Sequence, residues 1–164
     1  DDTTRYWILE PAQIGDDRDW RRVAAGMQYV CGIKKDESLW CWGLNWYGQL
    51  GIGDRGARKP TRVGQGWRWE SVAAANGHTC GIRKGGTLWC WGSWVPGGSA
   101  THLTQTPLQV GTVSGWTSVS AGKYHTCATR EDRTIWCWGS NSYGQLGNGR
   151  GWKSLPSRVV EPKK

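Results

Sequence analysis

Short hydrophobic runs alternate with polar, glycine-containing connections along most of the chain. In the first such unit, residues 23–33 and residues 39–43 are strand-like, and the residues between them are polar. A short polar connection between two β-rich runs is typical of a hairpin. Because side chains alternate along a strand, Trp40 and Trp42 project from one face and Cys41 from the other. A sheet that is apolar on both faces needs cover on both sides.

This unit occurs three times, and such a period predicts a repeat architecture. The copies read RVAAGMQYVCGIKKDESLWCWG from Arg22, SVAAANGHTCGIRKGGTLWCWG from Ser71 and SVSAGKYHTCATREDRTIWCWG from Ser118. Their first cysteines are 49 and 47 residues apart. A proline element, Pro-x-x-(Ile/Val)-Gly, precedes each copy, and Tyr-Gly-Gln-Leu-Gly follows two of them. We interpret a further proline element, residues 156–160, as the start of another blade.

Blades of a β-propeller have the required cover, because each sheet packs on its neighbours around an axis. Composition agrees, since 14 Trp and 25 Gly among 164 residues suit pleated surfaces between tight turns. The sequence therefore predicts an all-β fold of three propeller-type blades, a partial propeller completed by self-association. We expect a single repeat domain, residues 1–164, with blade units at about 11–59, 60–106 and 107–155, and with 156–164 as an edge strand and tail.

The repeated alanine-glycine, His-Thr-Cys, Trp-x-Trp-Gly and Gly-Gln-Leu-Gly elements resemble those of the regulator of chromosome condensation repeat family. The resemblance extends from about residue 11 to residue 160. It implies a propeller of about seven blades, where this chain has three repeats. Some members of that family act on small GTPases and chromatin, and some secreted bacterial relatives bind other proteins. Only recognition without catalysis is carried over to this chain.

Each repeat holds two cysteines ten residues apart, one on each arm of the same hairpin. The repeat selects one pairing, because facing strand positions place Cβ atoms about 4.5–5.5 Å apart, close to the disulfide range. Disulfides persist in oxidising compartments, so we expect a secreted, extracellular protein. The predicted bridges are Cys31–Cys41, Cys80–Cys90 and Cys127–Cys137.

A zinc site is the competing interpretation, because His78 and His125 each lie two residues before a cysteine. Zinc sites usually have cysteines about two to four residues apart, unlike these. Tyr29 takes the same position in the first repeat, which favours a packing position with a hydrogen-bonding tip. No motif of nucleophilic, metal-dependent or phosphate-binding catalysis occurs. We expect no enzyme activity, no cofactor and no metal.

Tryptophans outside the repeat are candidates for ligand contact, because a large ring with a donor both buries area and hydrogen-bonds. Local loop packing is the alternative for this group, which comprises Trp7, Trp46, Trp67, Trp94 and Trp152. Basic residues cluster at 55–62 and 150–153, where repeat loops would form a positive rim or simply a solvated surface. The candidate ligand-binding residues are Trp46, Trp94, Trp152, Arg55, Arg58, Lys59 and Arg150.

The net charge of +8 favours anionic partners. No apolar run is long enough to cross a bilayer, so we expect no membrane insertion, and the disulfides fit poorly with a nuclear role in binding nucleic acid. We predict a non-enzymatic extracellular interaction module whose partners are further copies of itself and a glycan or another protein. The alternatives are a lectin and a structural subunit of a filament or coat. The candidate assembly residues are Trp7, Ile8, Leu9, Pro156, Val159 and Val160.

Overall fold

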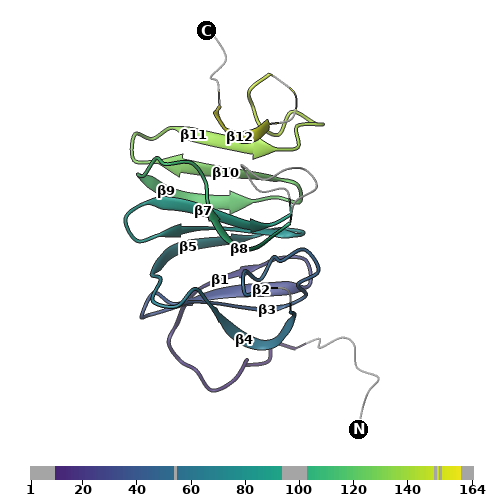
Figure 1. Cartoon of the computed structure of the whole chain (residues 1–164), viewed down its shortest axis with the longest axis vertical. Helices are drawn as coiled ribbons and strands as arrows, with labels where there is room; N and C mark the ends of the chain where they lie inside the picture. The colour runs from purple at the N-terminus through teal and green to yellow at the C-terminus, as the bar shows by residue number, and fades with distance from the viewer. Residues whose placement is uncertain (1–9, 54, 94–102, 150, 152, 160–164) are drawn as a thin grey trace.

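The structure is a computed structural model that describes residues 10–53, 55–93, 103–149, 151 and 153–159. These residues form twelve strands in three four-stranded antiparallel sheets, which we call blades 1, 2 and 3. Figure 1 shows the blades following one another along the long axis in chain order. Within the described ranges, no helix could span a membrane. The strands are β1 (Trp20–Ala25), β2 (Tyr29–Lys34), β3 (Leu39–Gly43), β4 (Ala57–Val63), β5 (Trp69–Ala74), β6 (His78–Arg83), β7 (Thr87–Gly92), β8 (Thr104–Gln109), β9 (Trp116–Ala121), β10 (His125–Arg130), β11 (Ile135–Gly139) and β12 (Lys153–Arg158).

Every strand in a blade pairs with the next one along the chain. The single strand-like run predicted at residues 23–33 is wrong in one respect, since it is divided between β1 and β2. A tight turn separates them, with a hydrogen bond from Gly26 N–H to the Tyr29 carbonyl of 2.9 Å and a φ of 65° at Gln28. This turn is not predicted from the sequence, because residues 23–33 are mostly small and apolar and contain no proline.

The proline element closes one blade instead of opening the next. Pro60 lies within β4, which pairs with β3, and Pro156 lies within β12, which pairs with β11. Both are edge strands, where a residue without an N–H is tolerated. The interpretation of residues 156–160 as the start of another blade is therefore wrong. The sheets span residues 20–63, 69–109 and 116–158, offset from the units read in the sequence, because a repeat can be divided at any point of its period.

The disulfides join directly facing residues of the second and third strands of each blade. Cys31 faces Cys41 in the ladder, and their Cα atoms are 4.1 Å apart. The other two bridges, Cys80–Cys90 and Cys127–Cys137, have the same register and the same Cα separation of 4.1 Å. These are the pairs that the ten-residue spacing predicts.

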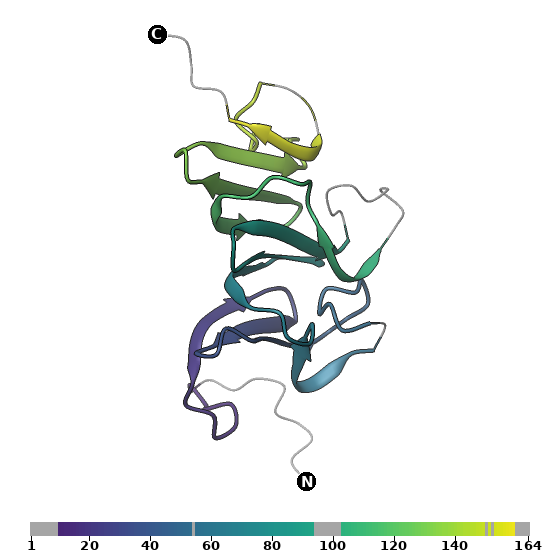
Figure 2. The same cartoon turned by 60° about the vertical axis from the view of Figure 1, so that its left-hand side comes forward.

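Each blade has two faces of different composition. We call the face with the tryptophans of the repeat its tryptophan face, and the face with the disulfide its cystine face. The cystine face of blade 1 packs on the tryptophan face of blade 2, so that Cys31 and Leu50 share a core with Trp69 and Trp91. The cystine face of blade 2 packs in the same way on Trp116 and Trp138 of blade 3. Figure 2 shows the same stack from a second direction.

Candidate functional site

Blade 1 is joined to blade 2 by buried hydrogen bonds around Tyr29. Its hydroxyl donates to the His78 carbonyl over 2.6 Å, accepts from the Ala75 N–H over 3.0 Å and lies 2.8 Å from Thr79 Oγ1. Thr79 in turn donates to the Gln49 carbonyl over 2.7 Å. Burial raises the pKa of Tyr29 to about 12, against the opposite effect of the bonds with Thr79 and Ala75. The hydroxyl therefore keeps its proton and fixes the two blades in one register.

The equivalent position joins blade 2 to blade 3. His78 Nε2 lies 2.8 Å from Thr126 Oγ1, and both side chains are buried. Burial, aided by the charge of His125, lowers the pKa of His78 to about 4, so the ring is neutral near neutral pH. No group of three metal-ligating side chains occurs in the part of the chain that the structure describes. The buried ring and its contact with Thr126 make His78 a hydrogen-bonding packing residue between these two blades.

Among the residues that the structure describes, no blade packs on the tryptophan face of blade 1. Trp20 and Trp42 are partly exposed, and Val23 is 74% exposed although its counterparts Val72 and Val119 pack into the two blade interfaces. A hollow of about 620 Å³ lies on this face. It is lined by Trp20, Trp40, Trp42, Lys34, Ile14 and Arg58, among others.

Lys34 lines this hollow, where it contacts both aromatic rings and carboxylates. Its Nζ lies 5.0 Å from the ring centroid of Trp20 and 5.1 Å from that of Trp40, within the range of a cation–π contact. It also lies 2.8 Å from an Asp17 carboxylate oxygen and 3.4 Å from one of Asp19. The hydrogen bond to Asp17 is the main cause that raises the pKa of Lys34.

In the described part of the chain, the cystine face of blade 3 also has no blade against it, and this face is more polar than its counterparts. Ile135 is 47% exposed, whereas the equivalent Leu39 and Leu88 are fully buried. Thr129 occurs where blades 1 and 2 have isoleucine, and its hydroxyl is 2.6 Å from Ser118 Oγ. Its polar atom is therefore satisfied within the blade.

A third feature is a groove of about 640 Å³ at the rim between blades 1 and 2. Its floor is the loop after β3, which Asn45 holds in shape. The Asn45 side-chain amide donates to the carbonyls of Gly53 (2.8 Å) and Arg55 (2.9 Å), and its oxygen accepts from the Leu50 N–H (2.8 Å). Asn141 accepts from the Leu146 N–H in the equivalent loop of blade 3. The loop is rigid by its own bonding.

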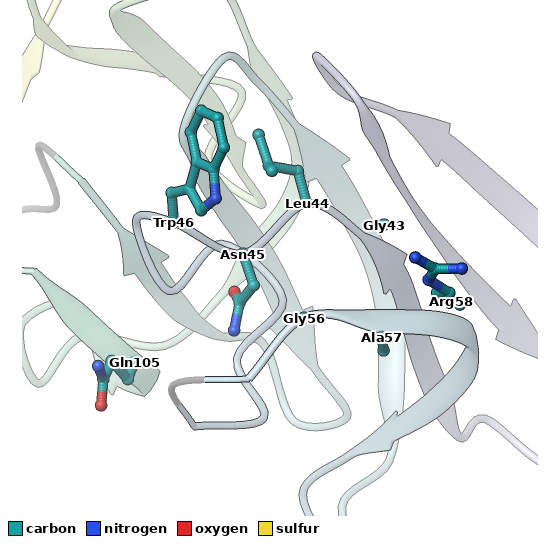
Figure 3. A pocket seen from close by; sticks show the side chains of 8 residues that line it. All are labelled: Gly43, Leu44, Asn45, Trp46, Gly56, Ala57, Arg58 and Gln105. Atoms are coloured by element: carbon teal, nitrogen blue, oxygen red, sulfur yellow. The ribbon is translucent and has the colours of Figure 1, made fainter. Parts of the chain in front are cut away.

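Trp46 and Arg58 line this groove from blade 1, and Gln105 lines it from blade 2. Figure 3 shows Trp46 on one side of Asn45 and Arg58 on the other. The Trp46 ring is 77% exposed, and the same loop position in blade 3 is Ser142, so the loop does not need a tryptophan there. An exposed ring, a guanidinium and an amide offer a stacking surface and hydrogen-bond donors to a ligand.

The structure brings only some of the sequence candidates together. Trp46 and Arg58 line the groove, Arg58 and Lys59 line the hollow, and Arg55 is exposed but lines neither. Trp67 is a packing residue, with its ring 6.0 Å from Trp69. Pro156 and Val159 belong to the β12 end of blade 3 and are partly buried. The candidates outside the described residues are Trp7, Ile8, Leu9, Trp94, Arg150, Trp152 and Val160.

Three residues of these sites were not predicted from the sequence, namely Gln105, Val23 and Asn45. Gln105 reaches the groove from another blade, and nothing in its own sequence signals that contact. Val23 looks like an ordinary strand residue, because its exposure depends on which blade lies against it. Asn45 carried a usable signal, since asparagine precedes Tyr-Gly-Gln-Leu-Gly by two residues in both copies.

Four-stranded antiparallel sheets stacked face to face are the architecture of β-propeller blades. Two models of the Regulator of chromosome condensation (RCC1) repeat match the sequence, one over residues 116–145 and the other over 36–82 and 133–164. Together they cover more than half of the chain, and the chain belongs to the RCC1 repeat family. A search of curated proteins finds no match.

Solved structures agree on the fold. Yeast RCC1 (Prp20) bound to Kap60 has a TM-score of 0.77 and 23% identity over 88% of this chain and 37% of its own. Prp20p from Saccharomyces cerevisiae, described with its binding to Gsp1p and histones, has a TM-score of 0.76 and 23% identity over 88% of this chain and 39% of its own. Human WBSCR16 has a TM-score of 0.79 and 20% identity over 87% and 40%. This chain spans about two fifths of the length of these structures.

Proposed function

We propose that this chain is a non-enzymatic, extracellular interaction module that joins further copies of itself blade to blade. The observation that carries the proposal is the open tryptophan face of blade 1. Val23 is exposed there, while the equivalent valines of blades 2 and 3 pack against the cystine face of a preceding blade. A cystine face is also open on blade 3, so one molecule offers both halves of a blade interface.

The extracellular setting is supported by the three disulfides, since bridges of this kind persist where the environment is oxidising. Association between two different faces is head to tail, and it closes into a ring or continues as a filament according to the rotation between copies. Apolar burial gives about 25 cal/mol per Å², so a few hundred Å² of tryptophan face supplies a substantial drive to associate.

The mass of the oxidised chain by light scattering tests this proposal. The expected result is a concentration-dependent rise above the monomer mass of 18.3 kDa. Val23→Glu places a charge on the open face without touching the packed core, and it should lower the association constant at least tenfold. Leu108→Glu, on the outer edge of blade 2, is the matched control and should associate like the parent. A chain that stays monomeric at high micromolar concentration would refute self-association.

A second candidate function is glycan binding at the rim groove, and it is favoured by the exposed Trp46 ring and by Arg58, which both line that groove. Indole rings stack on the apolar face of sugars, and a guanidinium pairs with carboxylate or sulfate groups. The test is a glycan array that contains neutral and sulfated or uronic-acid sugars. Trp46→Ala should reduce binding of any sugar that the parent chain binds. Arg58→Ala should reduce binding of the anionic sugars only. Unchanged binding by both variants would place the ligand elsewhere.

A further inference from the structure

The turn between the second and third strands contacts the following blade in blades 1 and 2, and the charge of this turn differs among the three blades. In blade 1 the contact residue is Glu37, whose carbonyl accepts from the Trp69 N–H over 2.8 Å. In blade 2 it is Gly86, whose carbonyl accepts from the Trp116 N–H over 3.0 Å. The equivalent residue of blade 3 is Arg133. These three residues share a left-handed backbone, with φ of 67°, 72° and 63°.

At both interfaces within the chain, this turn lies against the residue just before the first tryptophan of the following blade. The charge of that residue also differs among the three blades. Arg68 holds this place in blade 2, Gly115 in blade 3 and Asp19 in blade 1. Their equivalence is fixed by one backbone bond, since each carbonyl accepts from the residue after the second strand, namely Lys84, Glu131 and Lys35, at 2.8–2.9 Å.

The two interfaces within the chain are matched at these positions. Between blades 1 and 2, Glu37 is 2.5 Å from Arg68 Nε and 3.3 Å from Lys84 Nζ. Burial disfavours the charged form of Glu37, but these two cations outweigh it and lower its pKa. Between blades 2 and 3 two glycines meet, and a Cβ on Gly86 would lie 2.8 Å from the Gly115 nitrogen. Acid meets base at one interface, and glycine meets glycine at the other.

We infer that Arg133 of one copy pairs with Asp19 of the next, so that blade 3 stacks on the tryptophan face of blade 1 of a second copy. This inference rests on the proposed self-association and names its contact. The pair repeats the Glu37–Arg68 contact with the charges exchanged. Blade 1 is therefore suited to follow blade 3, whereas Glu37 against Asp19, or Arg133 against Arg68, would bring like charges together.

Two neighbours modify this contact. Asp19 is 3.4 Å from Lys34, but Lys34 keeps its shorter bond to Asp17 when the Asp19 carboxylate turns outward. Lys35 is the residue equivalent to Lys84, so it lies on blade 1 of the second copy, where its positive charge repels Arg133. Changing Lys35 to glutamate should therefore strengthen the association.

Charge exchange in the full, oxidised chain tests the inference by sedimentation analysis at low salt. Asp19→Arg and Arg133→Glu should each weaken self-association about tenfold, because each brings like charges together. The two variants mixed in equal amounts should associate, since the introduced arginine of one then meets the introduced glutamate of the other. The double variant Asp19→Arg/Arg133→Glu reproduces the polarity of Glu37 and Arg68 and should return to within about threefold of the parent.

Glu70→Lys is the control, an acid-to-base change on blade 2, and it should leave the association constant unchanged. If the parent associates and both single variants associate equally well, the pair is wrong while self-association stands. If the double variant stays as weak as the singles, the two residues do not meet. If the unaltered chain remains monomeric, the proposed self-association itself is refuted. Far-ultraviolet circular dichroism identifies any variant that fails to fold.

Discussion

Residues 39–43 of blade 1 and residues 88–92 of blade 2 have the same sequence, Leu-Trp-Cys-Trp-Gly, and differ in their surroundings. Trp91 is fully buried and donates from Nε1 to the Gln49 carbonyl over 2.9 Å. Trp42 has the same place in its blade but is partly exposed and packs on Trp20, with ring centroids 5.8 Å apart. The burial of a blade residue is therefore decided by the neighbouring blade, and equal sequences have unequal roles.

The largest expected difference is in stability. Trp91→Ala should lower the free energy of unfolding by about 3–5 kcal/mol, because it leaves a cavity between two blades and removes one of the two hydrogen bonds that the Gln49 carbonyl accepts. Trp42→Ala should cost about 1 kcal/mol in the monomer, since part of its ring is already in water. Urea unfolding of dilute, oxidised chains measures both. Equal losses would mean that the open face is as well packed as the internal one.

A second difference concerns pH. Burial lowers the pKa of His78 to about 4, while an unfolded chain binds the proton near pH 6.5. The unfolded state therefore takes up more protons in this window, and stability falls as the pH falls through it. We expect a loss of about 2 kcal/mol between about pH 8 and pH 5. His78→Gln should flatten this dependence, whereas His125→Gln should leave most of it. A slope that survives His78→Gln would assign the titration to another group.

The smallest expected effect compares two tyrosines. Tyr29→Phe removes a buried hydroxyl that bonds blade 1 to blade 2 and leaves the Ala75 N–H without that acceptor. The loss should be about 1–2 kcal/mol. Tyr124→Phe changes an exposed side chain and should be neutral within about 0.5 kcal/mol. Thermal unfolding of the two variants side by side measures the contrast, and a neutral Tyr29→Phe would remove this residue from the blade contact.

The features of the fold that depend on local periodicity, the disulfide pairs and the number of blades, could be predicted from the sequence. Cysteines ten residues apart on a hairpin lead directly to the bridges, and three copies of one unit lead to three blades. The turn at Gly26 and the place of the proline element were misread, because strand pairing and not composition decides where a sheet ends.

The candidate site was predicted only in part. Trp46 was found because it interrupts the repeat, and Arg58 because it belongs to a basic run. Gln105 was missed, since it reaches the groove from a different blade. Arg133 and Asp19 are ordinary charged residues until the Glu37–Arg68 contact shows which positions face each other between blades.

The central claim, that a second copy covers the tryptophan face of blade 1, is tested most directly by oxidative footprinting at increasing protein concentration. Trp91 and Trp46 serve as internal references, one buried and the other on the rim. We expect Trp42 to lose reactivity toward the oxidant as the mass of the particle rises, while Trp91 stays unreactive and Trp46 stays reactive throughout. A rise in mass that leaves the reactivity of Trp42 unchanged would contradict this claim.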